Sequence, residues 1–73
     1  MEWISNKKQL PKRYGLYLVS DDYSWYVKLI KQGAILRYDE ADDGYCRDKE
    51  WENKEWWWME LPNRPDGASP FYD

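Results

Sequence analysis

The sequence predicts a mainly β fold, or a small α+β fold, built on a single antiparallel meander sheet of three to four strands. Three observations support this prediction. Apolar and polar side chains alternate with a period of two over residues 14–20 and 23–30, which is the period of a strand. Turn-forming residues separate these runs. The connections are also too short for crossovers, so neighbouring strands are expected to pair antiparallel.

The first two strands are predicted over residues 14–20 and 23–31. In the first strand, Leu16 and Leu18 project to one face of the sheet, whereas Tyr17 projects to the other. The second strand alternates in the same way, and one of its faces is formed by Tyr23, Trp25, Val27 and Leu29. The turn between the two strands is supplied by Ser20, Asp21 and Asp22.

The third and fourth strands are predicted over residues 33–39 and 54–60. Gln32 and Gly33 form a tight turn before the third strand, because glycine adopts positive φ at little cost. The fourth strand contains three consecutive tryptophans. Its period of two sends Trp56 and Trp58 to one face and Trp57 to the other.

Two segments lack a strand pattern. Residues 40–53 are acidic at the start and of mixed charge later, and they are predicted to form a long surface loop. Residues 63–73 include two prolines and a glycine, and they are predicted to form a flexible tail. Residues 1–62 then make up one small β-rich domain, because 73 residues leave no room for a second core.

The small size of the domain decides what its aromatic side chains must do. A domain of this length buries only about 60–65% of its unfolded surface, so its stability margin is thin. Most of the aromatic residues must therefore be structural, and only a few remain for a ligand. The residues expected in the structural core are Trp3, Leu16, Leu18, Trp25, Val27, Trp56 and Trp58.

Composition narrows the classes of function. Cys46 is the single cysteine, so there is no internal disulfide, and the chain lacks histidine. We find no signal-peptide pattern and no apolar stretch of about 18 residues, so we expect a cytoplasmic protein that does not span a membrane. The net charge is −3 and the basic residues are scattered, which argues against binding to duplex nucleic acid.

The two ends of the chain carry short motifs. Trp3-Ile4-Ser5 is followed by Leu10-Pro11, and the chain later has Trp58-Met59-Glu60-Leu61-Pro62. In these motifs the chain resembles a small phage and prophage domain, catalogued as domain-of-unknown-function family 551. Members of that family open with a W-I-S…L-P signature and close with a W-M-P-L-P-like one, where this chain has Glu60 in place of proline. The resemblance implies a phage or prophage origin, and hence a bacterial host cell, together with a small β-rich fold, and it supplies no activity.

Three possible chemical sites lack support in the sequence. Asp39 to Glu50 has part of the spacing of a calcium-binding loop, but Ala41 and Arg47 stand at ligand positions. No pair of acidic residues has a separation defined by the sequence, so carboxylate catalysis lacks support. Cys46 has no histidine to activate it as a nucleophile. We therefore expect a non-enzymatic protein without a cofactor, a metal site or catalytic residues.

Protein recognition is the function that the composition favours, because interfaces are enriched in Trp, Tyr, Met and Arg. The hypothesis is a phage-encoded module that binds an unidentified host or phage protein, for example as an inhibitor of a bacterial defence protein of the anti-CRISPR type. Trp57 is its central residue, because it projects away from the face of Trp56 and Trp58. The hypothetical binding patch comprises Trp57, Tyr26, Tyr38, Arg37, Asp39, Glu40, Asp42 and Asp43.

Two alternative functions remain open. The first is a structural or self-assembling phage accessory protein, which would form a homodimer through sheet edges or exposed tryptophans. The second is an aromatic platform that binds a sugar or single-stranded nucleic acid, although such binders normally pair their aromatic residues with a basic groove. For Trp57 itself a structural role also remains open, with the loop 40–53 or Phe71 and Tyr72 shielding it.

Overall fold

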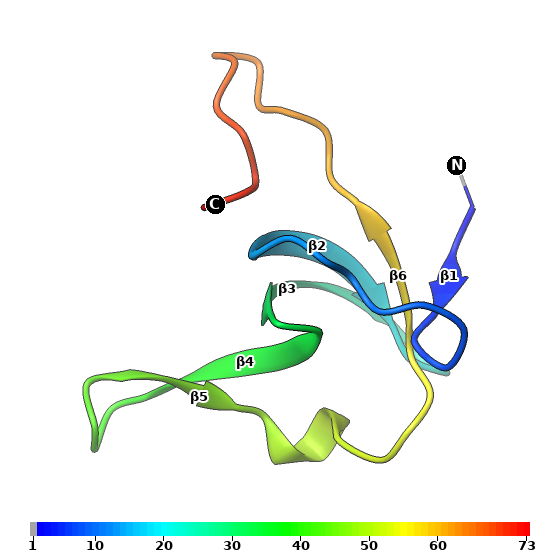
Figure 1. Ribbon diagram of the computed structural model, residues 1–73, viewed down its shortest axis with the longest axis vertical. Helices are drawn as coiled ribbons and strands as arrows, with labels where there is room; N and C mark the ends of the chain where they lie inside the picture. Colours follow the sequence, from blue (N-terminus) through cyan, green and yellow to red (C-terminus); the bar gives the residue numbers. More distant parts are fainter. Residues whose placement is uncertain (1) are drawn as a thin grey trace.

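The computed structural model describes residues 2–73 and shows an antiparallel sheet of six strands (Figure 1). The strand order is β1-β6-β2-β3-β4-β5, and a short 3-10 helix, η1, lies between β5 and β6. The mainly β prediction is confirmed, but the number of strands is six instead of three to four. The elements are β1 Ile4–Ser5, β2 Gly15–Ser20, β3 Trp25–Lys31, β4 Ala34–Asp39, β5 Gly44–Arg47, η1 Lys49–Trp51 and β6 Trp57–Glu60.

Two tight turns connect the first part of the meander. Between β2 and β3, the Asp21 carboxylate accepts hydrogen bonds from the backbone N–H groups of Tyr23 (2.9 Å) and Ser24 (2.8 Å). Between β3 and β4, Gln32 (φ 53°) and Gly33 (φ 77°) form a two-residue turn of the I′ type. Both turns fall where the sequence predicts them.

The segment predicted as the loop 40–53 contains β5 and η1. β5 pairs with β4 through four residue pairs, and the Asp48 backbone N–H then donates to the Ile35 carbonyl (2.8 Å). The Asp48 carboxylate caps η1 by accepting from the Glu50 N–H (3.1 Å). This cap turns the chain so that Trp51 is buried. β5 was not predicted from the sequence because it is short and polar.

β6 completes the sheet from the other side. It pairs with β2 and with β1, so the last strand lies between the first two. The tail, which was expected to be flexible, returns to β2: Phe71 bridges Gly15, and the Leu16 N–H donates to the Pro70 carbonyl (2.8 Å). The Tyr72 N–H also donates to the Tyr14 carbonyl (2.8 Å). The tail therefore extends the line of β6 along β2.

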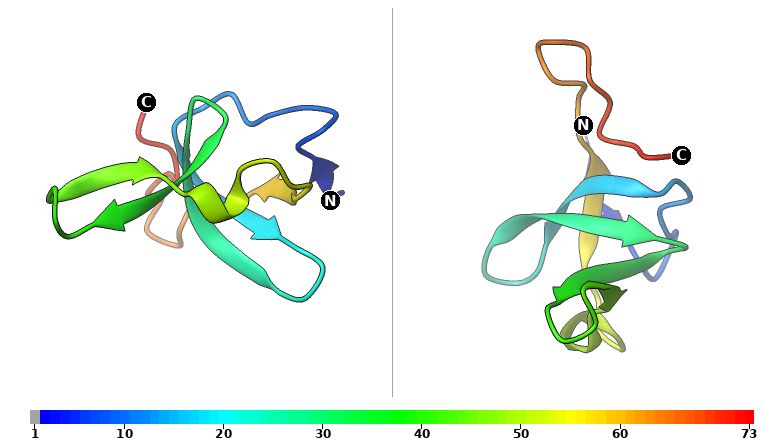
Figure 2. Two further views of the ribbon diagram at one scale, coloured as in Figure 1. Left: turned by 90° about the horizontal axis from the view of Figure 1, so that it is seen from below. Right: turned by 90° about the vertical axis from the view of Figure 1, so that its left-hand side faces the viewer.

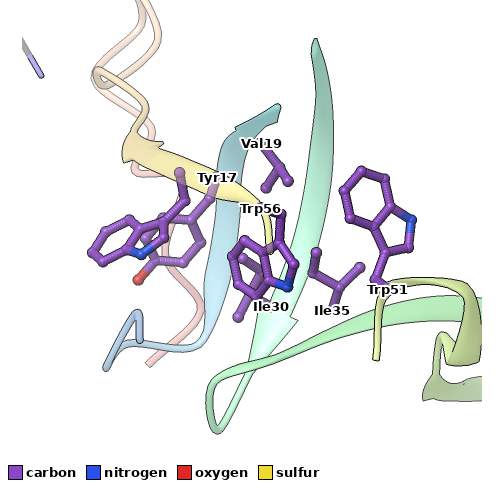
Figure 3. Close-up of a cluster of buried hydrophobic side chains, with 7 residues drawn as sticks. Tyr17, Val19, Ile30, Ile35, Trp51 and Trp56 are labelled. Atoms are coloured by element: carbon purple, nitrogen blue, oxygen red, sulfur yellow. The ribbon is translucent and has the colours of Figure 1, made fainter. Parts of the chain in front are cut away.

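The hydrophobic core lies on one face of the sheet, which we call the inner face (Figure 3). Tyr17 lies at one end of the cluster, with its ring edge-on to Trp58 (5.5 Å between centroids) and close to Phe71 (5.6 Å). Its hydroxyl donates to the Arg13 carbonyl (2.8 Å), and burial raises the pKa of Tyr17 above its ordinary value. The buried apolar residues are Tyr17, Val19, Ile30, Ile35, Trp51, Trp56 and Trp58.

Three segments cover this inner face. Residues 6–13 contribute the Gln9 carbonyl, which accepts from the Trp58 indole N–H (2.9 Å). η1 contributes Trp51, and the tail contributes Phe71. Among residues 2–73, no helix is both long and apolar enough to cross a membrane.

Candidate protein-binding surface

The other face of the sheet, which we call the open face, is apolar and continuous over β3, β2 and β6. Residues that stand directly opposite in an antiparallel pair share a face. Leu18 stands opposite Val27 on one side and Met59 on the other, which joins the three strands. The side chains of the open face on these strands are Leu16, Leu18, Ser20, Trp25, Val27, Leu29, Trp57 and Met59.

Much of the open face is in contact with solvent. Trp25 is 66% exposed and Val27 is 53% exposed. Trp3 lies beside Trp57 and Ser20 at one corner, and it is itself 41% exposed. Strands of six, seven and four residues, about 4.8 Å apart, cover on the order of 300 Å² of the sheet. An apolar patch of this size is within the range of the largest patches on monomers, which are often functional.

The arrangement of the chain explains why this face is uncovered. Residues 6–13, η1 and the tail all pack on the inner face, where they contact Trp58, Tyr26 and Tyr17. These covering segments lie on the inner face, and on the open face, within residues 2–73, Trp3 lies beside Ser20 and Trp57 at one corner. The sheet therefore presents one closed face and one open face.

The expected core needs correction on this point. Trp56 and Trp58 are buried, as predicted. Leu16, Leu18, Trp25 and Val27 lie on the open face instead, and Trp3 is exposed at its corner. Alternation separates two faces correctly but does not say which face of one strand joins which face of the next. The register shows that Val19 stands opposite Trp58, so the Tyr17 and Val19 side of β2 belongs to the core.

The hypothetical patch around Trp57 is not one surface. Trp57 is half-buried on the open face, but Tyr26 stands opposite Val19 on the inner face, where its ring packs edge-on to Trp51 (5.8 Å). Arg37 belongs to β4, opposite Cys46 of β5. β2 and β3 separate β6 from β4 in the sheet, so Arg37 is not on a strand next to that of Trp57.

The remaining residues of that patch gather in the β4–β5 hairpin, which projects from the body of the domain (Figure 2). Tyr38 packs edge-on to Tyr45 (5.5 Å) and donates its hydroxyl hydrogen bond to the Asp43 carboxylate. This bond raises the pKa of Tyr38 above its ordinary value. Asp39 lies at the end of β4, and its carboxylate accepts from the Ala41 N–H (3.0 Å) within the turn that contains Glu40 and Asp42.

The acidic residues of this turn do not form a recognisable metal centre. Within residues 2–73, no group of three or more His, Cys, Asp or Glu side chains is arranged to hold an ion. Cys46 is half-buried on β5. The hydrogen bonds of Tyr38, Asp39 and Asp43 thus stay within the hairpin, and the open face is left without an assigned role.

Trp51, Ile30 and Ile35 were missed as core residues. Trp51 was missed because it stands alone in a charged segment, whereas Ile30 and Ile35 flank the β3–β4 turn and are brought together only by pairing. Tyr17 and Val19 were missed as well, because alternation alone does not distinguish their side of β2 from that of Leu16 and Leu18.

Comparisons with known proteins gave no match to a family model, to a curated protein or to a solved structure. The resemblance of the chain ends to a phage domain family stays a prediction.

Proposed function

We propose that this chain is a non-enzymatic protein-binding module and that the open face is its binding surface. The observation that carries this proposal is the asymmetry of the sheet. One face is sealed by three segments, while the other exposes Trp25 and Val27 beside the half-buried Leu18 and Met59. Keeping an apolar face in water has a free-energy cost that binding removes.

The composition of the open face supports a protein as the partner. Exposed tryptophan is a frequent anchor of protein interfaces, and its truncation often costs 2 kcal/mol or more of binding free energy, or about thirtyfold in affinity. The strand residues of this face carry no charge between Trp25 and Leu29, and Lys31 lies at its end. A nucleic-acid platform would instead place basic side chains among its aromatic rings.

The resemblance of the chain ends supports a phage or prophage setting for the partner. In that setting we propose that the open face occupies a surface of a host or phage protein. Inhibition of a bacterial defence protein is the specific form of this proposal, and it rests on the resemblance alone.

The test compares capture of bacterial proteins by three tagged chains in nuclease-treated lysate. Trp25→Ser removes the most exposed tryptophan of the open face, and Tyr45→Ser removes a ring of similar exposure (60%) from the β4–β5 hairpin. We expect the parent and Tyr45→Ser to capture the same stoichiometric protein and Trp25→Ser to lose it. The captured protein is then purified and titrated with each variant, and an expected affinity loss of about thirtyfold should appear only for Trp25→Ser.

The opposite result would contradict the proposal. If Trp25→Ser binds as the parent does while Tyr45→Ser does not, the hairpin is the binding surface. Melting curves of both variants check that the fold is retained, because both side chains are exposed.

A further inference from the structure

The second feature of interest, besides the open face, is the free edge of β3. By this we mean the backbone edge of residues 25–29 that faces away from β2. β2 pairs with β3 over Trp25 to Ile30. On the other side, β4 pairs only with Ile30 and Lys31, after which the two strands separate. Figure 2 shows the β2–β3 and β4–β5 hairpins extending in different directions. Within residues 2–73, no strand accompanies residues 25–29 on that side.

The turn geometry identifies the backbone groups on this edge. In a two-residue I′ hairpin, the residues that flank the turn exchange both backbone hydrogen bonds, so the N–H and C=O of Lys31 point toward β4. Alternate residues of a strand point their backbone groups the same way. Trp25, Val27 and Leu29 therefore direct their N–H and C=O groups to the free edge.

This edge lacks the devices that normally keep edge strands apart. Proteins protect edges with prolines, bulges, short strands or several charges. The free edge is five residues long, contains no proline, and has Lys28 as its one charged residue. The two outermost strands of the sheet are different: β1 has two residues, and β5 has four and ends at Arg47.

The sequence of the free edge is complementary to itself. Two copies related by a two-fold axis pair antiparallel. In such a pair, a residue whose N–H and C=O groups point to the free edge must stand opposite a residue of the other copy whose groups also point to the free edge. An axis at Val27 uses all five residues and places Trp25 opposite Leu29 of the other copy. It also places Lys28 opposite Tyr26, and within one chain the Lys28 ammonium already lies 5.3 Å from that ring centroid.

The neighbouring registers are worse. An axis at Lys28 sets this cation against its own copy and needs Trp25 to pair with Lys31, which β4 already occupies. An axis at Tyr26 leaves the Leu29 backbone unpaired and extends into the β2–β3 turn, where the Asp21 carboxylate holds the Ser24 N–H. Only the Val27 register sets Lys28 opposite an aromatic ring and also uses the whole edge.

We propose that the free edge of β3 pairs with the same edge of a second copy of this chain, antiparallel and centred on Val27. The two-fold axis is perpendicular to the sheet, so the open faces of both copies lie on the same side and form one continuous apolar surface. The edge contact is smaller than a standard interface of about 800 Å² per partner, so the dimer is a weak one. This dimer needs no other protein, and it goes beyond the proposed function.

The first test isolates the backbone of the edge from the open face. Val27→Pro removes an N–H that points to the free edge and leaves the bonds to β2 intact, a position where strands tolerate proline. Val27→Thr is the matched control, because it keeps the N–H and the β-branched shape. By sedimentation equilibrium of the purified chains between about 10 μM and about 1 mM, we expect the parent and Val27→Thr to approach twice the monomer mass, and Val27→Pro to stay monomeric.

The second test reads the register. In a Cys46→Ser background, Val27→Cys places its thiol on the two-fold axis, where a disulfide to the other copy fits the Cα separation of about 5.5 Å. Trp25→Cys is the control, because the register separates the two copies of residue 25 by about 13 Å along the strands. With oxidised glutathione, we expect covalent dimer from Val27→Cys and little from Trp25→Cys.

Three outcomes would overturn the proposal. The parent chain stays monomeric across the concentration range, or Val27→Pro dimerises as well as Val27→Thr, or Trp25→Cys crosslinks as fast as Val27→Cys. None of these results bears on capture of another protein by the open face, so the two proposals fail separately. Circular dichroism of each variant confirms that the sheet is retained.

Discussion

Gly15 and Phe71 form an antiparallel bridge that fixes the tail against the first residues of β2. The contact is so close that a Cβ atom at Gly15 would lie 2.6 Å from the Pro70 carbonyl oxygen and 2.7 Å from the Phe71 Cα. Both of these are backbone atoms, which cannot move aside as a flexible side chain would. The glycine is required by this approach of two backbones, since its own φ is not positive.

We therefore predict that Gly15→Ala displaces the tail from β2. The tail would lose its backbone hydrogen bonds, and Phe71 would leave the ring of Tyr17. Overpacking of this kind typically costs about 1–3 kcal/mol of unfolding free energy. Denaturant unfolding measures the loss, and amide chemical shifts of residues 70–72 locate it. Gly44→Ala is the control, because its Cβ would meet nothing closer than 3.8 Å, and an equal loss in that variant would contradict the prediction.

The two signature tryptophans should differ in their effects on stability. Trp58 is buried and bonded to the Gln9 carbonyl, so Trp58→Ala should lower the unfolding free energy by about 3–5 kcal/mol. In a domain this small, a loss of that size removes most of the folded population. Trp3 is 41% exposed at the corner of the open face, so we expect Trp3→Ala to cost about 1 kcal/mol or less. Equal losses, measured by denaturant unfolding, would place Trp3 in the core after all.

The attachment of the tail should depend on pH through Asp73. The Tyr14 backbone N–H, and then the Arg13 guanidinium, hold the pKa of Asp73 below its ordinary value. A carboxylate whose pKa is lower in the folded state stabilises the fold fully above its unfolded pKa of about 4. That contribution is lost as the pH falls through the lower, folded value.

Melting temperatures of the parent and of Asp73→Asn between about pH 2 and pH 7 check this effect. We expect the parent to be the more stable at neutral pH and the difference to disappear in acid. Asp22→Asn removes the same charge from an exposed position of the β2–β3 turn and serves as the control. A difference that grew on acidification would have the wrong sign for this mechanism.

The alternation of side chains predicts where strands lie but not how they pair. The three meander strands and their turns were predictable, because alternation and turn residues are local signals. β5 was not, since its four residues contain one exposed ring and no apolar stripe. The return of the tail depends on hydrogen bonds to residues about 55 positions away, and composition does not report such bonds.

The candidate site was predictable only in part. The period of two correctly separates Trp57 from Trp56 and Trp58. The choice of face for β2 and β3 was wrong, because pairing register is a tertiary property and nothing local ranks Leu16 and Leu18 above Tyr17 and Val19. The same reversal moved Trp25 and Val27 from the expected core to the open face.

The position of β6 between β1 and β2 has a consequence for the order of events during synthesis. Residues 4–5 can pair only after residues 57–58 have been made, and Tyr17 meets Trp58 and Phe71 late for the same reason. Pairings this distant in sequence close slowly, because chain entropy must be lost before they form. While the β2–β3–β4 hairpins emerge from the ribosome, the inner face still lacks β6, η1 and the tail. In the nascent chain β2 is therefore apolar on both sides, with Tyr17 and Val19 on one face and Leu16 and Leu18 on the other, and folding is completed only once Trp56 and Trp58 have left the exit tunnel.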